Sequence, residues 1–192
     1  MWKETLNSEN DLVPYVERFL ERFPKGGFFG LSGNLGAGKT QFVRSVIRKI
    51  AGTDVRVMSP TYVFHQTYRL SIPVDHFDLY RLENADESTL QEIGYDSVVE
   101  RHRAEPGFLF IEWPEKALEG LLDLDYRIQI TPDGLKRDFQ IETWQASSIT
   151  TTWIPGTRPW ATFAPKPLRR MDPTTAPMVV LALRTLRQSL FV

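Results

Sequence analysis

The chain has 192 residues, of which 42% are hydrophobic and 24% charged, and its formal net charge is −1. This ordinary balance provides no net positive charge for binding DNA or RNA over the whole molecule, and the absence of cysteine excludes disulfides and thiolate metal sites. The polar first residues and the lack of a long apolar run predict a cytoplasmic protein without signal peptide or membrane contact.

The first part of the chain predicts a helix, a strand and a second helix. Apolar residues at helical spacing indicate a helix over 12–23, and Pro14 is tolerated only in its first turn. The segment 27–32 reads as a short buried strand. A helix over 39–52 follows and ends at Gly52.

The rest of the first 145 residues predicts further strands and two short helices. The strands are 55–58, 62–70, 74–80 and 107–113, and the helices are 86–94 and 95–103. The short turn at 71–73 predicts that the strands beside it pair antiparallel. Two last strands, 126–131 and 137–144, flank the turn sequence PDGLK. The expected fold is α/β, with a mixed, mainly parallel sheet flanked by helices and an antiparallel hairpin insertion.

A change in composition near residue 146 predicts a boundary. Residues 146–192 hold six basic residues against one acid, and six of the thirteen prolines. By subtraction, this segment carries about +5 and residues 1–145 about −6. We therefore expect a domain over 1–145 and a basic Pro/Thr-rich extension over 146–192, poorly ordered apart from an added strand in SSITTTW or an amphipathic helix over 177–191.

The stretch GLSGNLGAGKTQF, residues 30–42, indicates a phosphate-binding loop. Its residues Gly33, Gly38, Lys39 and Thr40 match the pattern G-x-x-x-x-G-K-[ST] between a predicted strand and a predicted helix. Amides of a glycine-rich turn can converge on an anion, and the positive end of the helix dipole adds to them. The expected nucleotide contacts are Gly33, Asn34, Leu35, Gly36, Ala37, Gly38, Lys39, Thr40 and Gln41.

Two acidic residues at strand ends are candidates for metal and hydrolysis chemistry. Lys39 is expected to reach the β- and γ-phosphates, and the Thr40 hydroxyl to ligate Mg²⁺. Glu112 ends the apolar run FLFIE, where a second magnesium ligand is needed. Asp78, in HFDLYR, would hold the metal's water shell or orient the attacking water.

Other residues near these strand ends have more open roles. Ser59 and Thr61, in SPTY, could sense the γ-phosphate or form an ordinary turn. His76 lies two residues before Asp78, so it should share its strand face and orient that carboxylate. Trp113 would pack in the core or line the nucleotide pocket. The three histidines show no metal-ligand clustering.

Five motifs in this order, GNLGAGKT, SPTY, HFDLYRL, EIGYD and FIEWPEK, resemble the bacterial TsaE (YjeE) family over roughly residues 5–145. The resemblance implies a P-loop ATPase that assists threonylcarbamoylation of tRNAs reading ANN codons. Its expected partners are the TsaD and TsaB proteins, whose complex it would reset by slow Mg²⁺-dependent ATP hydrolysis, with tRNA contacted through that complex.

The resemblance also assigns site residues. Lys39 would hold phosphates, Thr40 and Glu112 Mg²⁺, and Asp78 would serve hydrolysis. Ser59 and Thr61 would form a switch-like loop, and Trp113 would lie near the nucleotide. The sequence departs from the family pattern at Asn34, where Asp is frequent, at Gln41, where a small hydroxyl residue is frequent, and in its extension.

Alternatives remain open at this stage. A P-loop small-molecule kinase would need an arginine-bearing lid, and the acidic stretch LENADESTLQEIGYD is a poor phosphate clamp. A GTPase would need an N-K-x-D element, which the sequence lacks. A nucleotide-dependent assembly switch without enzymatic activity overlaps with the ATPase hypothesis, since slow turnover would resemble it.

Overall fold

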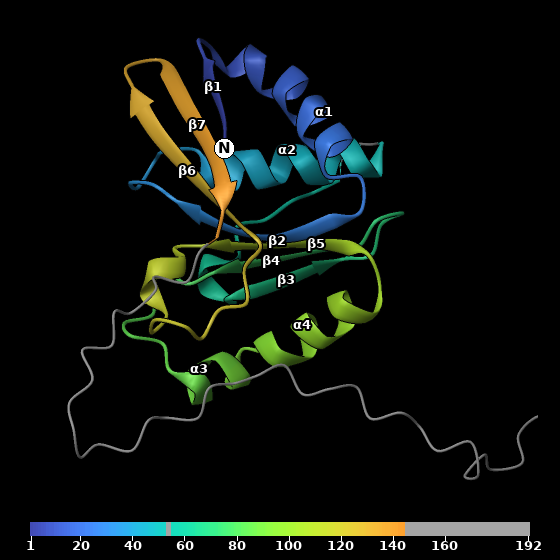
Figure 1. Ribbon diagram of the computed structural model, residues 1–192, viewed down its shortest axis with the longest axis vertical. Coiled ribbons are helices and arrows are strands. Elements are labelled where there is room, and N and C mark those ends of the chain that lie inside the picture. The colour runs from blue at the N-terminus through green and yellow to red at the C-terminus, as the bar shows by residue number, and fades with distance from the viewer. Residues whose placement is uncertain (53–54, 145–192) are drawn as a thin grey trace, which may run out of the picture. The chain divides into compact units, whose positions relative to one another are not determined.

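The computed structural model describes residues 1–52 and 55–144, which include a seven-stranded sheet with strand order β1-β7-β6-β2-β5-β4-β3 (Figure 1). The strands are β1 Trp2–Leu6, β2 Gly26–Ser32, β3 His65–Tyr68, β4 Val74–Asp78, β5 Gly107–Glu112, β6 Tyr126–Asp133 and β7 Lys136–Thr143. The four central strands pair in parallel, whereas β1, β7 and β3 pair antiparallel with their neighbours. The predicted mixed sheet with an antiparallel hairpin is confirmed.

Helices cover both faces of the sheet (Figure 1). They are α1 Leu12–Arg22, α2 Lys39–Ala51, α3 Glu87–Glu92 and α4 Tyr95–Ala104, with short 3₁₀ turns η1 Glu9–Asp11, η2 Pro60–Tyr62 and η3 Pro114–Lys116. Pro14 lies in the first turn of α1, as predicted. Of these helices, α1 and α2 pack on one face, and α3 and α4 on the other.

The alternating side chains of β5 explain why both faces of the sheet carry a hydrophobic core. Phe108 and Phe110 join the aromatic cluster under α1 and α2, where Phe19 and Phe42 also lie. The residues between and after them, 109 and 111, join the second cluster under α4. Because side chains alternate across a strand, the run GFLFIE is buried along its whole length, as expected for a central parallel strand.

The structure corrects several predicted strands. Residues 55–58 form no strand. The edge of β4 is paired instead with β3 over residues 65–68, and Pro60 begins a 3₁₀ turn ahead of β3. The strand predicted over 62–70 is correspondingly shorter. The strand predicted over 74–80 ends at Asp78, whose side chain accepts a hydrogen bond from the Tyr80 amide at 3.0 Å and turns the chain.

An edge strand was missed at the start of the chain. β1 pairs antiparallel with β7, and Leu6 is its one buried residue. A strand with a single buried side chain gives almost no alternation signal, so the sequence does not reveal it. The predictions for the extension over 146–192 lie outside the described residues. Within the part of the chain that is described, no helix has the length and apolarity to cross a bilayer.

Candidate nucleotide-binding site

The glycine loop, residues 33–38, connects the end of β2 to the start of α2. Gly33, Gly36 and Gly38 all have positive φ angles, of 148°, 77° and 108°. A Cβ on Gly33 would lie 2.4 Å from the Ile130 carbonyl oxygen, whereas a Cβ on Gly36 or Gly38 would meet nothing within 4 Å. Glycine is therefore required at position 33 by the close contact with β6, whereas the space beside Gly36 and Gly38 is open.

Lys39 is the first residue of α2 and is only 4% exposed. Its Nζ donates hydrogen bonds to the carbonyl oxygens of Gly33 (2.6 Å) and Asn34 (3.1 Å), and it lies 3.7 Å from the centre of the Trp113 ring. Burial lowers the pKa of Lys39, while the carboxylates of Glu112, Glu115 and Asp78 act in the opposite direction. The Lys39 ammonium is thus held beside the glycine loop by two backbone carbonyl oxygens, and the oxygens of a bound anion could take their place.

Thr40 and Glu112 come together although 72 residues separate them. The Thr40 hydroxyl donates to Glu112 Oε2 at 3.0 Å, and the Glu112 side chain is almost fully buried at the end of β5. The structure thereby juxtaposes the hydroxyl and the carboxylate that the sequence suggested as magnesium ligands.

His76 contacts Glu112 rather than Asp78, which corrects the sequence prediction. His76 Nε2 lies 2.8 Å from Glu112 Oε1. In the parallel register of β4 and β5, Asp78 lies opposite Glu112 and His76 opposite Phe110. All three polar side chains therefore share the face that α2 covers, and the longer Glu112 side chain reaches back to His76.

Asp78 is buried and is the end of a short hydroxyl chain. The Ser59 and Thr61 hydroxyl oxygens are 2.8 Å apart, and the Thr61 hydroxyl donates to Asp78 Oδ2. The backbone leaves this SPTY segment through Phe64, a non-glycine residue with a φ of 61°. Strained backbone of this kind is frequent at ligand-responsive segments.

Trp113 and Glu115 border the same strand ends. Trp113 also has a positive φ, 59°, and its ring lies 5.2 Å from that of Tyr80 in addition to its contact with Lys39. The Ser32 hydroxyl donates to Glu115 Oε2 at 3.3 Å. Sequence reasoning did not select Glu115, although it follows Glu112 by three residues at the same strand end.

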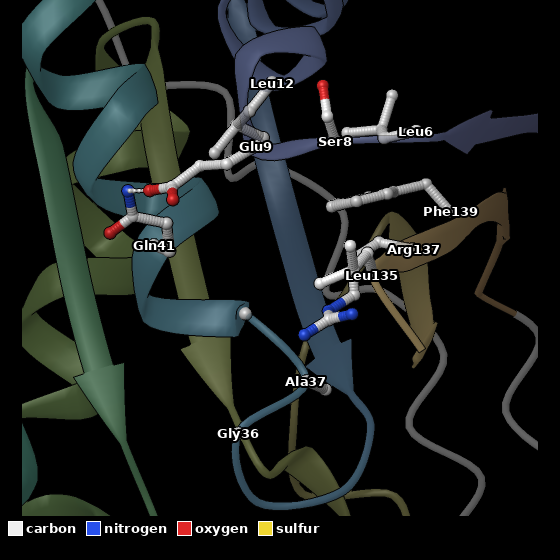
Figure 2. Close-up of a pocket in the computed structure, with 11 residues that line it drawn as sticks. Leu6, Ser8, Glu9, Leu12, Gly36, Ala37, Gln41, Leu135, Arg137 and Phe139 are labelled. Carbon is white, nitrogen blue, oxygen red and sulfur yellow. Dashed lines mark hydrogen bonds between the residues drawn. The ribbon is translucent and has the colours of Figure 1, made fainter. Parts of the chain in front are cut away.

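A cavity of about 410 Å³ lies beside the glycine loop. Figure 2 shows Gly36, Ala37 and Gln41 along one side of it and Leu6 and Leu135 across from them. Apolar side chains form much of its wall: Leu6, Leu12, Leu135 and Phe139. Polar groups come from Ser8, Glu9, Gln41 and Arg137, and Gln41 Nε2 donates to Glu9 Oε1 at 3.2 Å.

The sequence did not predict this cavity. The cavity is lined by residues of β1, the η1 turn and the β6–β7 hairpin, and these elements come from opposite ends of the domain in sequence. Leu35, by contrast, does not line it and is 75% exposed at the outside of the loop.

The donor set fits magnesium better than a transition metal. Among the described residues, no group of three or more histidine, cysteine or acidic side chains is arranged to hold a metal ion. Mg²⁺ needs few protein ligands, because it keeps several waters and binds substrate phosphates. One buried carboxylate and one hydroxyl beside the glycine loop match this small requirement for protein ligands.

Similar proteins carry the same family name. Over 112 residues, the chain is 33% identical to the tRNA threonylcarbamoyladenosine biosynthesis protein TsaE of Rickettsia conorii, covering 58% of this chain and 60% of that one. The protein of that name from Haemophilus influenzae is 36% identical over 101 residues, covering 52% and 60%. The crystal structure of Bacillus subtilis YdiB aligns with a TM-score of 0.49 and 20% identity, over 74% of this chain and 84% of YdiB.

The match to the R. conorii and H. influenzae relatives thus spans about 60% of their length. The sequence model of the family described as "Threonylcarbamoyl adenosine biosynthesis protein TsaE" matches residues 6–139, which is most of the chain. The resemblance inferred from the five motifs is confirmed: the chain belongs to the TsaE family.

Proposed function

We propose that this protein binds and hydrolyses ATP with Mg²⁺ in the threonylcarbamoyladenosine modification of tRNA. The observation that carries the proposal is the 3.0 Å contact between the Thr40 hydroxyl oxygen and Glu112 Oε2, which lies beside an open glycine loop. Phosphate-binding loops of this pattern place their Thr hydroxyl on Mg²⁺, and an acid from a neighbouring strand completes the site.

Each residue of the site has a defined task in this proposal. The amides of residues 33–38 and the first turn of α2 hold the phosphates, and Lys39 exchanges its two carbonyl contacts for phosphate oxygens. Thr40 and Glu112 hold Mg²⁺, which when bound neutralises charge on the β- and γ-phosphates.

The hydroxyl chain of the SPTY segment supports hydrolysis. Asp78 is buried, its two oxygens accept hydrogen bonds from the Thr61 hydroxyl and the Tyr80 amide, and Thr61 and Ser59 connect it to the surface. In the proposed reaction Asp78 orients the attacking water. The hydrogen bonds that join Ser59, Thr61 and Asp78 then stay intact or break according to whether a γ-phosphate is bound.

The cavity beside the glycine loop suits the base and sugar of the nucleotide. It shares Gly36, Ala37 and Gly38 with the loop and offers apolar walls with a few polar groups at its edge. Ligand pockets generally combine these two features at a volume of about 300–1,000 Å³. We assign the adenine ring to this cavity.

Membership of the TsaE family supports a proposal for the biological role. The R. conorii and H. influenzae relatives are named for tRNA threonylcarbamoyladenosine biosynthesis. We propose that this chain acts in the cytoplasm on the TsaD–TsaB complex, which modifies tRNAs reading ANN codons, and contacts tRNA through that complex. Capture of purified TsaD–TsaB in the presence of ATP supports this role, whereas no capture with or without ATP favours the kinase hypothesis.

Substitution Glu112→Gln tests the hydrolytic function. The amide cannot supply an anionic metal ligand, so we expect Mg²⁺-dependent ATP turnover to fall by at least about 10-fold, a loss that even indirect disturbance of metal ligands often causes. Binding of ATP in EDTA should remain near the wild-type value. Phosphate release and calorimetry measure the two quantities.

The exposed α4 residue Glu100 gives the matched control, Glu100→Gln, which should retain turnover. Equal turnover in wild type and Glu112→Gln would remove Glu112 from the metal site.

A further inference from the structure

His76 lies in the middle of β4 and is completely buried. Its Nε2 lies 2.8 Å from Glu112 Oε1, while the other oxygen of the same carboxylate accepts the Thr40 hydroxyl. The terminal torsion of a glutamate is broad, so its hydrogen bonds set the plane of the carboxylate. These two donors therefore fix the orientation of Glu112.

The two donors are not equivalent. In the proposed site the Thr40 oxygen binds magnesium through a lone pair while its O–H still donates to Oε2, so Thr40 restrains the oxygen on the metal side and His76 restrains Oε1. The His76 ring makes no other hydrogen bond among the described residues. His76 can thus hold Oε1 throughout and leave Oε2 for the metal.

The lack of a hydrogen-bond partner at the other ring nitrogen of His76, among the described residues, supports the same role. Nδ1 is buried and has no hydrogen-bond partner in the described part of the chain. Donation from Nε2 to a carboxylate places the proton of the neutral ring on Nε2, which leaves Nδ1 as an unsatisfied acceptor. A phenylalanine of similar shape would avoid that cost, so the imidazole gains its advantage at this position from Glu112.

A second buried histidine allows a direct comparison. His102 Nε2 lies 2.7 Å from Asp75 Oδ2. Asp75 precedes His76 on β4, so this pair lies on the opposite face of the sheet, away from the glycine loop. The described residues thus contain three histidine–carboxylate contacts, two of them to Asp75, and of the three the His76–Glu112 contact borders the proposed magnesium site.

We propose that His76 is a positioning residue that orients the Glu112 carboxylate for Mg²⁺. This inference rests on the proposed function, because it concerns how the proposed metal ligand is held. Partners in the second coordination shell typically contribute about 10–100-fold to metal affinity. The effect of His76 should therefore be seen in the Mg²⁺ requirement rather than in nucleotide affinity without metal.

Three variants separate this role from a general structural one. His76→Gln keeps an amide N–H at about the reach of Nε2, His76→Leu removes it, and His102→Leu removes the matching donor to Asp75 on the other face of the sheet. ADP binding is measured by calorimetry in EDTA and over a MgCl₂ titration, and bound Mn²⁺ by electron paramagnetic resonance. If the leucine variant does not fold, His76→Asn replaces it, since its shorter amide cannot reach Glu112.

We expect His76→Leu to need about 10-fold more Mg²⁺ or Mn²⁺ for half-maximal effect and to bind ADP normally in EDTA. His76→Gln should lie within about 3-fold of wild type, and His102→Leu should lose thermal stability without a change in Mg²⁺ requirement. An unchanged requirement in His76→Leu, or an equal loss of ADP binding with and without Mg²⁺, overturns the positioning role. A wild-type chain that binds no ADP overturns the proposed function and this role with it.

Discussion

Lys39 illustrates how much of the proposed chemistry depends on a single side chain. Its ammonium is buried, contacts two loop carbonyls and lies against an aromatic ring. A charge kept in such a place is costly unless an anion uses it.

We expect Lys39→Ala to weaken ATP binding because it removes charge-assisted contacts to phosphate. Such contacts contribute about 1.5–3 kcal/mol, or about 10- to 150-fold in Kd. Titration calorimetry gives the Kd. Lys49→Ala is the control, since Lys49 is an exposed residue of the same helix paired with Glu17; an unchanged Kd in Lys39→Ala would refute the role of the loop.

Asp75 is the second residue on which the structure concentrates polar contacts. It is fully buried and accepts hydrogen bonds of 2.6–2.7 Å from His65, Thr67, Arg101 and His102. Burial by itself would raise the pKa of Asp75, but these hydrogen bonds outweigh it and hold the pKa well below its usual range.

Asp75→Asn should therefore lower the free energy of unfolding at pH 7 by about 3–5 kcal/mol, the usual cost of breaking a buried ion pair. Since the folded-state pKa is depressed, the contribution of Asp75 is fully present above the unfolded pKa of about 3.9 and is lost as the pH falls below it. Urea unfolding at pH 7 and pH 3 measures both effects.

The wild type should lose more stability between these two pH values than Asp75→Asn does. Asp96→Asn, at an exposed position on α4, should behave as wild type. Parallel pH dependences in wild type and Asp75→Asn would show that Asp75 contributes no such linkage.

At the scale of elements, the β6–β7 hairpin is the feature with the clearest functional consequence. Its turn carries Leu135, which is 88% exposed and lines the cavity beside the glycine loop. A large apolar side chain in that position is expected when a flat apolar ligand covers it.

Leu135→Ser should weaken ATP binding about 3- to 10-fold, because covering part of a leucine contributes somewhat less than the 1.5–3 kcal/mol of complete burial. Binding of inorganic triphosphate should not change, since it lacks the base. Leu118→Ser, a half-exposed leucine outside the cavity, serves as control. Equal losses for ATP and triphosphate in Leu135→Ser would contradict the assignment of the base.

The elements also show what the sequence could and could not predict. The glycine loop, α2, β5 and the hairpin carry strong local signals in glycine spacing, apolar periodicity and turn residues. β1 carries almost none, because one buried residue in an edge strand sets no period. The segment 55–58 is rich in β-branched residues but has no strand partner in the described structure.

The features of the candidate site can also be divided into those that the sequence predicts and those that it does not. Thr40 was predicted as a metal ligand from the glycine-loop motif, and Glu112 from its place at the end of the apolar run FLFIE. The contact of His76 with Glu112 depends on the register of two parallel strands, which no local pattern encodes. The cavity needs segments from both ends of the domain, so only the folded chain reveals it.

At the scale of the whole molecule, the described residues form a hydrophobic cluster on each face of the sheet. The members of both clusters given by the described part of the chain lie within residues 2–144, and β7 ends at Thr143. The boundary at residue 146 remains a prediction from charge and proline content.

Truncation after Gln145 should preserve the melting temperature within about 2 °C, since surface changes away from core contacts shift stability by no more than about 0.5 kcal/mol. ATP turnover should also be preserved. Scanning calorimetry and phosphate release test this on the shortened chain beside the full one. Unfolding of the shortened chain would place part of the extension in the core and move the boundary.

The most direct test of the central claim is a crystal structure with ADP and Mn²⁺, with data collected at the manganese absorption edge. The anomalous peak should lie within bonding distance of both Thr40 Oγ1 and a Glu112 carboxylate oxygen, with the diphosphate inside the glycine loop and the base against Leu135. A peak elsewhere, or a diphosphate bound away from residues 33–40, would contradict the account.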